Sequence, residues 1–166
     1  MQDGGVPFRA SAVVLCFLFR DTVSDGRQVL MGLKKTGFGL GRVVTLGGHI
    51  EAGETPGQAA VREVEEESGV LVREADLQRA GTIEWIFPAK PSLDMSTVLF
   101  RAHQWEGEPV ETEEILPAWY PAGEMPYARM WPDSALWMPR LLAGEYFNAV
   151  VTIADDNVNV TSVVFS

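Results

Sequence analysis

A helix bracketed by glycines, between positions 48 and 70, constrains this chain more than any other segment. Thr55 followed by Pro56 predicts the helix start, a hydroxyl N-cap before a proline at the first helical position, and Gly69 predicts the helix end. The helix should therefore run from about Thr55 to Ser68. One of its faces is small and apolar and should pack closely on a sheet through Ala59, Ala60, Val61 and Val64.

The other face of the predicted helix is acidic. Positions three and four apart share a helix face, so Glu63, Glu66 and Glu67 should project from a single turn. Oxygen ligands gathered in this way suit a hard divalent ion, Mg²⁺ or Mn²⁺, which commonly completes its shell with substrate phosphates. A solvated face is the usual interpretation of a charge run. Such a face does not need bracketing glycines or Arg62 beside the cluster, so we favour a metal site with a phosphate substrate.

The same segment resembles the Nudix box, Gly-x5-Glu-x7-Arg-Glu-U-x-Glu-Glu-x-Gly-U with U apolar, at every fixed position. The resemblance implies that Glu63, Glu66 and Glu67 bind the metal ions and that Gly48 adds a backbone carbonyl ligand. Glycine at this position also lets the backbone approach metal and phosphate closely. The fixed positions are filled by Gly48, Glu54, Arg62, Glu63, Val64, Glu66, Glu67, Gly69 and Val70.

Supporting roles follow from the same resemblance. Arg62 is expected to orient a glutamate through a salt bridge, and Glu54 to support the metal site. Glu114 matches a glutamate that relatives place near the metals, although a solvated turn is an equal alternative for it. Glu65 occupies a free position of the pattern and is expected to be solvated.

Segments on both sides of the box resemble the oxidised purine nucleoside triphosphatases, the animal MutT homologues within this family. They are Lys34-Lys35-Thr-Gly37-Phe38-Gly39-Leu-Gly41-Arg42 before the box, and Met130-Trp131-Pro132-Asp133 with Trp137-Met138-Pro139 after it. The resemblance implies that Phe38 and Trp131 line a base pocket, that Trp131 stacks on the purine and that Asp133 hydrogen-bonds the base edge. Lys34 would lie near the nucleotide, and Ser11 completes the predicted substrate contacts. Core packing is the alternative for Trp131.

Two positions depart from these relatives. Val44 stands where they carry an asparagine that hydrogen-bonds the base, and Ser134 stands where they carry a second aspartate. A buried polar group discriminates because leaving it unpaired costs about 1–3 kcal/mol. The sequence therefore predicts the chemistry more firmly than the base, and whether an oxidised purine is preferred is a hypothesis.

The whole chain, 1–166, should form one domain, since its length and its 46% hydrophobic content suffice for one core and not for two. Strand and helix patterns alternate, which indicates an α/β or α+β fold, and the resemblance implies a mixed sheet sandwiched between helices. A second helix should run from about Pro132 to Ala143, and residues 146–166 should form a hairpin. The remaining predicted strands are 10–19, 28–33, 43–46, 79–87, 95–104 and 115–120.

Several classes of protein are disfavoured. No apolar run approaches the length of a membrane span, and no signal peptide is recognisable. The single cysteine, Cys16, excludes an intramolecular disulfide, which together with these absences predicts a cytoplasmic protein. A net charge of −10 argues against binding of a nucleic-acid polymer. The expected partner is a nucleotide, bound by a monomer or homodimer.

These inferences predict a Mg²⁺-dependent nucleoside triphosphate diphosphatase, in which water attacks and NMP and pyrophosphate are released. The alternatives are hydrolysis of a dinucleoside polyphosphate or ADP-ribose, and a nucleotide-sensing domain with a relic box. Sensing domains usually lose box glutamates, and none is missing here. The sequence leaves open which glutamate accepts the proton and which phosphorus is attacked.

Overall fold

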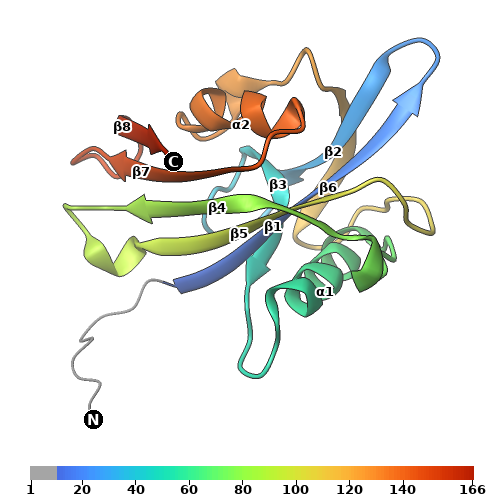
Figure 1. The fold of residues 1–166 in the computed structure, drawn as a ribbon, viewed down its shortest axis with the longest axis horizontal. Helices are drawn as coiled ribbons and strands as arrows, with labels where there is room; N and C mark the ends of the chain where they lie inside the picture. Colours follow the sequence, from blue (N-terminus) through green and yellow to red (C-terminus); the bar gives the residue numbers. More distant parts are fainter. Residues whose placement is uncertain (1–10) are drawn as a thin grey trace.

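The computed structural model describes residues 11–166, and they form one mixed eight-stranded sheet with a helix on each face (Figure 1). The strand order is β6-β2-β3-β1-β5-β4-β7-β8. The helices are α1 (Pro56–Ser68) and α2 (Ser134–Leu142). The strands are β1 (Ser11–Thr22), β2 (Gly26–Lys34), β3 (Val43–His49), β4 (Gln78–Ile86), β5 (Met95–Ala102), β6 (Ile115–Pro121), β7 (Phe147–Ile153) and β8 (Val160–Phe165). Three short 3₁₀ turns are η1 (Glu74–Asp76), η2 (Pro91–Leu93) and η3 (Tyr127–Arg129).

The sheet is mixed because β1–β5 and β4–β7 pair in parallel and the other neighbours pair antiparallel. Strand β1 lies at its centre and changes partner along its length. Residues 13–16 pair with β3, whereas residues 19–22 pair with β2. The sheet is therefore continuous from the hairpin of β1 and β2 to the C-terminal hairpin of β7 and β8.

Each face of the sheet carries its own hydrophobic core, which confirms the predicted sandwich. Successive residues of β1 point to opposite faces. Val14 and Leu18 pack with α1 in one core, and Phe17 packs with α2 in the other. Helix α1 contributes Ala59, Ala60 and Val64 to the first core, and α2 contributes Trp137, Met138 and Leu141 to the second.

The box helix begins and ends as predicted. Thr55 is its N-cap, with Oγ1 accepting from the backbone N–H of Gln58, and Gly69 ends it at φ 76°. The Gln58 side chain reciprocates by accepting from the backbone N–H of Thr55 at 3.0 Å, which completes a capping box. This contribution of Gln58 was missed from the sequence, although glutamine three residues after a threonine is its recognised signal.

Several element ends differ from the predictions. Strand β3 continues through Gly47 and Gly48 because they pair with Leu15 and Val14 of β1. Helix α2 starts later than predicted, at Ser134, whose N–H closes a turn onto the carbonyl of Trp131. Strand β5 stops at Ala102, and the first hairpin pairs out to Thr22 and Gly26, beyond the predicted strand ends. The predicted first residue of β1, at position 10, lies outside the described residues.

Within residues 11–166, none of the helices has the length and apolar character needed to cross a membrane.

Candidate active site

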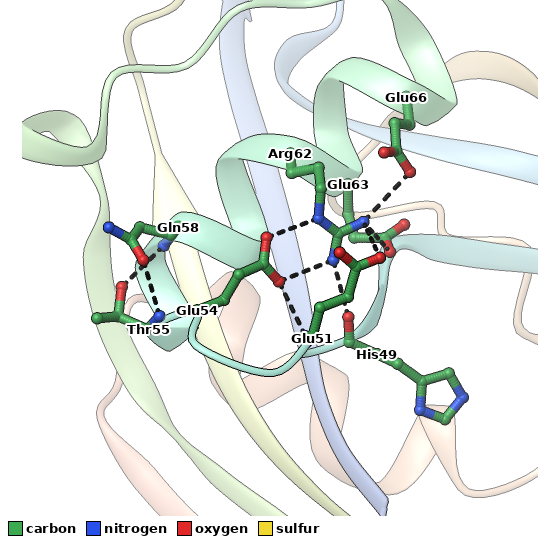
Figure 2. Close-up of polar contacts among 8 residues, drawn as sticks. All are labelled: His49, Glu51, Glu54, Thr55, Gln58, Arg62, Glu63 and Glu66. Carbon is green, nitrogen blue, oxygen red and sulfur yellow. Dashed lines mark hydrogen bonds and ion pairs between the residues drawn. The ribbon is translucent and has the colours of Figure 1, made fainter.

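Arg62 of α1 organises the acidic cluster where α1 meets the end of β3 (Figure 2). Its Nε and Nη2 donate to the two oxygens of Glu54 at 2.7 and 3.0 Å, a bidentate pair. Its Nη1 donates to Glu63 at 2.9 Å and to Glu66 at 3.2 Å, and Nη2 also donates to the carbonyl of His49 at 2.9 Å. The hydrogen bond from Arg62 lowers the pKa of Glu54 and holds it ionised. The salt bridge predicted for Arg62 is therefore present, with Glu54 as its bidentate partner and Glu63 and Glu66 as additional ones.

Glu63 lies against the backbone of β3. A Cβ built on Gly48 would stand 2.5 Å from the Glu63 carboxyl carbon, so a side chain at this position would displace the carboxylate from where it lies. Burial raises the pKa of Glu63, although Arg62 opposes the shift. Gly48 and Glu63 are thus brought together as predicted, with no side chain between the strand and the carboxylate.

Glu67 is the innermost carboxylate of the cluster, with 3% of its surface exposed. Its Oε1 accepts from the backbone N–H of Gly47 at 2.8 Å. Burial raises the pKa of Glu67 to about 8, with smaller contributions from Glu63 and Glu114, while Gly47 and Lys34 lower it. A nearby cation would stabilise the charged form of a carboxylate in this environment.

The three helix glutamates thus occupy different environments on one side of α1. Glu66 is 59% exposed, Glu63 is partly buried and Glu67 is buried. Within residues 11–166, no three His, Cys, Asp or Glu side chains are gathered closely enough to form a metal-binding group. In this arrangement Arg62 donates hydrogen bonds to Glu63 and Glu66, and Glu67 accepts from the backbone of β3.

The donors present nevertheless fit a hard divalent cation. They are all oxygens, two of the carboxylates have raised pKa values because they are buried, and the backbone at Gly48 is open to close approach. Glu114 acts on the pKa values of both Glu63 and Glu67, which places its charge beside the cluster.

A cavity of about 200 Å³ adjoins the cluster on the α2 face of the sheet. Lys34, Gly47 and Glu67 line its wall together with apolar and aromatic side chains. The predicted base-pocket residues line the same cavity: Phe38, Val44, Trp131, Asp133 and Ser134. Ser11 is not among the lining residues, although Val13, two positions along β1, is. The structure therefore brings every predicted substrate contact except Ser11 to one cavity.

Trp131 contacts protein groups through its ring. The ring of Phe38 stacks on it with centroids 4.9 Å apart, and the Arg42 guanidinium lies 4.1 Å from its centroid. Phe38 is itself 60% exposed. A purine stacking on Trp131 would therefore share or replace these contacts.

Asp133 is buried and held by two indoles. Its Oδ2 accepts from Nε1 of Trp85 and from Nε1 of Trp137, both at 2.8 Å. This leaves Oδ1 available to a ligand. Sequence reasoning did not identify Trp85, because a tryptophan within a buried strand gives no signal beyond core packing.

Comparison with known proteins identifies the family of this chain. The model of the NUDIX domain family matches residues 9–141. The oxidized purine nucleoside triphosphate hydrolase of Danio rerio is 42% identical over 125 residues, which cover 75% of this chain and 78% of the relative. Its Mus musculus counterpart is 40% identical over the same shares. The structure of the MutT protein of Bacillus halodurans superposes with a TM-score of 0.77, at 22% identity, covering 94% of this chain and 97% of the other. With a complete box that runs from Gly48 of β3 through α1 to Val70, this chain belongs to the Nudix family.

Proposed function

We propose that this protein is a Mg²⁺-dependent nucleoside triphosphate diphosphatase that converts purine nucleoside triphosphates, oxidised purines such as 8-oxo-dGTP among them, to NMP and pyrophosphate. One observation carries the proposal. The cavity that Trp131 and Asp133 line is also lined by Lys34 and Glu67, so a base and its phosphates have adjoining sites. The names of the two animal relatives support the same substrate class.

The residues that would hold the ions are Glu63, Glu66, Glu67, Glu114 and the carbonyl of Gly48. When bound, such ions lower the pKa of water and neutralise charge on the bridging phosphate oxygen. The protein supplies the orientation. Because Arg62 fixes Glu54 and Glu63 through charge-assisted hydrogen bonds, the carboxylates are positioned before substrate arrives.

Other side chains act on the nucleotide. The Lys34 ammonium would offset phosphate charge at the wall of the cavity, and Trp131 would provide a face for the purine. We place this activity in the cytoplasm, on a monomer or homodimer, with a free nucleotide rather than a nucleic-acid polymer as substrate. Size-exclusion chromatography with light scattering measures the oligomeric state.

The test is a nucleotide panel assayed for pyrophosphate and orthophosphate, with ADP-ribose and a dinucleoside polyphosphate included. We expect NMP and pyrophosphate from purine triphosphates, and reversible loss of activity on chelation. Hydrolysis in ¹⁸O-labelled water should place the label in pyrophosphate, as attack on the β-phosphorus requires. Release of orthophosphate with NDP would reject the diphosphatase assignment.

A matched pair of variants tests the metal site. Glu66→Gln should reduce turnover by about 100-fold or more, the scale on which a preorganised charge acts. Glu65→Gln removes the neighbouring carboxylate on the exposed face of the same helix and should leave turnover unchanged. Equal activity of the two variants would contradict the metal site.

A further inference from the structure

The turn of the C-terminal hairpin, residues 154–159, contributes Asn157 to the wall of the cavity. Asp156 fixes this turn, because its Oδ1 accepts from the backbone N–H groups of Val158 at 2.9 Å and Asn159 at 2.8 Å. The N–H of Asn157 donates to the carbonyl of Ala154 at 2.9 Å. The backbone that carries the Asn157 side chain is therefore held on both sides.

Asn157 adopts a conformation that most residues avoid. Its φ is 60°, and it is the one non-glycine residue with positive φ in the part of the chain that the structure describes. Asparagine tolerates this left-handed region better than most residues. Glycine would adopt it more easily, so the conformation alone does not require an amide here.

The Asn157 side chain has an unmet hydrogen-bonding capacity. Its Oδ1 is buried without a hydrogen-bond partner, and within residues 11–166 the one other such atom is Oγ1 of Thr97, which does not line the cavity. Buried polar atoms in folded proteins nearly always have a partner. In this conformation protein atoms cover the oxygen. The amide torsion of asparagine is soft, so rotation of the side chain can present the oxygen to the cavity that the residue lines.

The other polar side chains that line the cavity are those of Lys34, Thr45, Glu67, Asp133 and Ser134. Asp133 has committed Oδ2 to the indoles of Trp85 and Trp137, which leaves it one oxygen. Val44 is apolar, and both it and Asn157 line the same cavity. Lys34 and Glu67 line the same cavity and carry the charges expected to act on the phosphates and the metal. Among the described residues that line the cavity, Asn157 is the one with a carboxamide side chain, and its Oδ1 has no hydrogen-bond partner.

We propose that Asn157 is a specificity-determining residue whose amide oxygen accepts a hydrogen bond from an N–H group of the purine base. The inference rests on the proposed function, since it assumes that a purine nucleotide occupies the cavity. Asp133 and the Asn157 oxygen are both acceptors, so together they match a base edge that carries two N–H groups. A 6-oxopurine with a 2-amino group, as in guanine, has such an edge, whereas adenine places a ring acceptor beside its amine. The chain should therefore favour guanine-type over adenine-type nucleotides.

The test uses Asn157→Gly, which removes the amide and accepts the positive φ, and Asn157→Asp, which keeps an acceptor oxygen and also tolerates this φ. Asp155→Gly is the matched control, because it alters an exposed residue of the same turn that does not line the cavity. Dissociation constants for dGMP, dIMP and dAMP are measured by calorimetry with chelator present. The kcat/KM values of the matching triphosphates are measured with Mg²⁺.

We expect Asn157→Gly to weaken dGMP binding about 5- to 150-fold, the range for one hydrogen bond in a dry site, with little change for dAMP. Asn157→Asp and Asp155→Gly should retain the preference for dGMP. An equal loss for all three nucleotides would show that Asn157 only shapes the turn, and unchanged binding would show that its oxygen has no contact with the base. Either result overturns the proposal.

Binding and hydrolysis separate this inference from the proposed function. If the wild-type protein binds purine monophosphates and does not cleave the triphosphates, the diphosphatase assignment fails and the role of Asn157 is still decided by the binding series. If the wild-type protein binds no purine nucleotide, the role that we assign to Asn157 is wrong, whatever compound in the panel is hydrolysed.

Discussion

Replacing Glu67 with glutamine should change how the stability of the metal-free protein depends on pH. The pKa of Glu67 lies at about 8 in the folded protein, against an ordinary 4.5. The folded state therefore binds this proton more tightly than the unfolded chain does. The protonated Glu67 side chain therefore contributes to the free energy of unfolding. This contribution is fully present below the pKa that Glu67 has in the unfolded chain, and it is lost as pH rises through the pKa that it has in the folded protein. Between about pH 5 and about pH 8 the linkage relation gives a loss of about 3 kcal/mol in the free energy of unfolding.

Glutamine at position 67 removes the titrating carboxyl group and keeps the hydrogen bond from the backbone of Gly47. Its amide oxygen accepts from the Gly47 N–H in place of the carboxylate, and the side chain has nearly the same volume. The variant should therefore lose less stability than the wild type over the same range, and at about pH 8 it should be the more stable protein. Charges elsewhere titrate in both proteins, so the difference between the two curves isolates Glu67.

The assay is urea unfolding with chelator present, followed by tryptophan fluorescence across the pH series. Glu65→Gln, an exposed carboxylate on the same helix, is the control and should follow the wild type. Mg²⁺ should restore stability to the wild type at high pH more than to Glu67→Gln. Parallel curves for wild type and Glu67→Gln would refute the assignment of Glu67 as a buried carboxylate with a raised pKa.

Three other changes test the site. Gly48→Ala should lower turnover at least about tenfold, because its Cβ would stand 2.5 Å from the Glu63 carboxyl carbon. A Mg²⁺ titration of this variant should also show weaker Mg²⁺ binding. Unchanged turnover and unchanged Mg²⁺ affinity would contradict this contact. Val44→Asn with Ser134→Asp should raise the kcat/KM ratio of 8-oxo-dGTP to dGTP about 5- to 150-fold. If the wild-type protein already prefers 8-oxo-dGTP over dGTP by roughly several hundredfold, Val44 and Ser134 do not loosen its specificity. Trp131→Ala should weaken all purine triphosphates together, since stacking does not distinguish the base edge, and a selective loss would point to an edge contact instead.

The local elements of this protein follow from short stretches of sequence. The box helix could be predicted closely because its start and end depend on Thr55, Pro56 and Gly69, which act within one or two turns. The C-terminal hairpin could be predicted because alternating apolar residues flank polar turn residues. Element ends that depend on a partner strand were predicted less well. From the sequence alone, the strand was expected to end before Gly47 and Gly48. In the structure these glycines continue β3, because β1 supplies their hydrogen-bond partners.

The sequence by itself determined which carboxylates lie along one side of α1 and which arginine lies among them. These depend on helical spacing, which is fixed by backbone geometry. Tertiary structure decided the environment of each group. It buried Glu67 against β3 while leaving Glu66 exposed, tied Asp133 to the indoles of two distant tryptophans, and brought Asn157 from the C-terminal hairpin to the cavity. Burial, pKa and hydrogen-bond partners depend on residues far apart in the chain, which only the packing of the sheet and its two helices brings together.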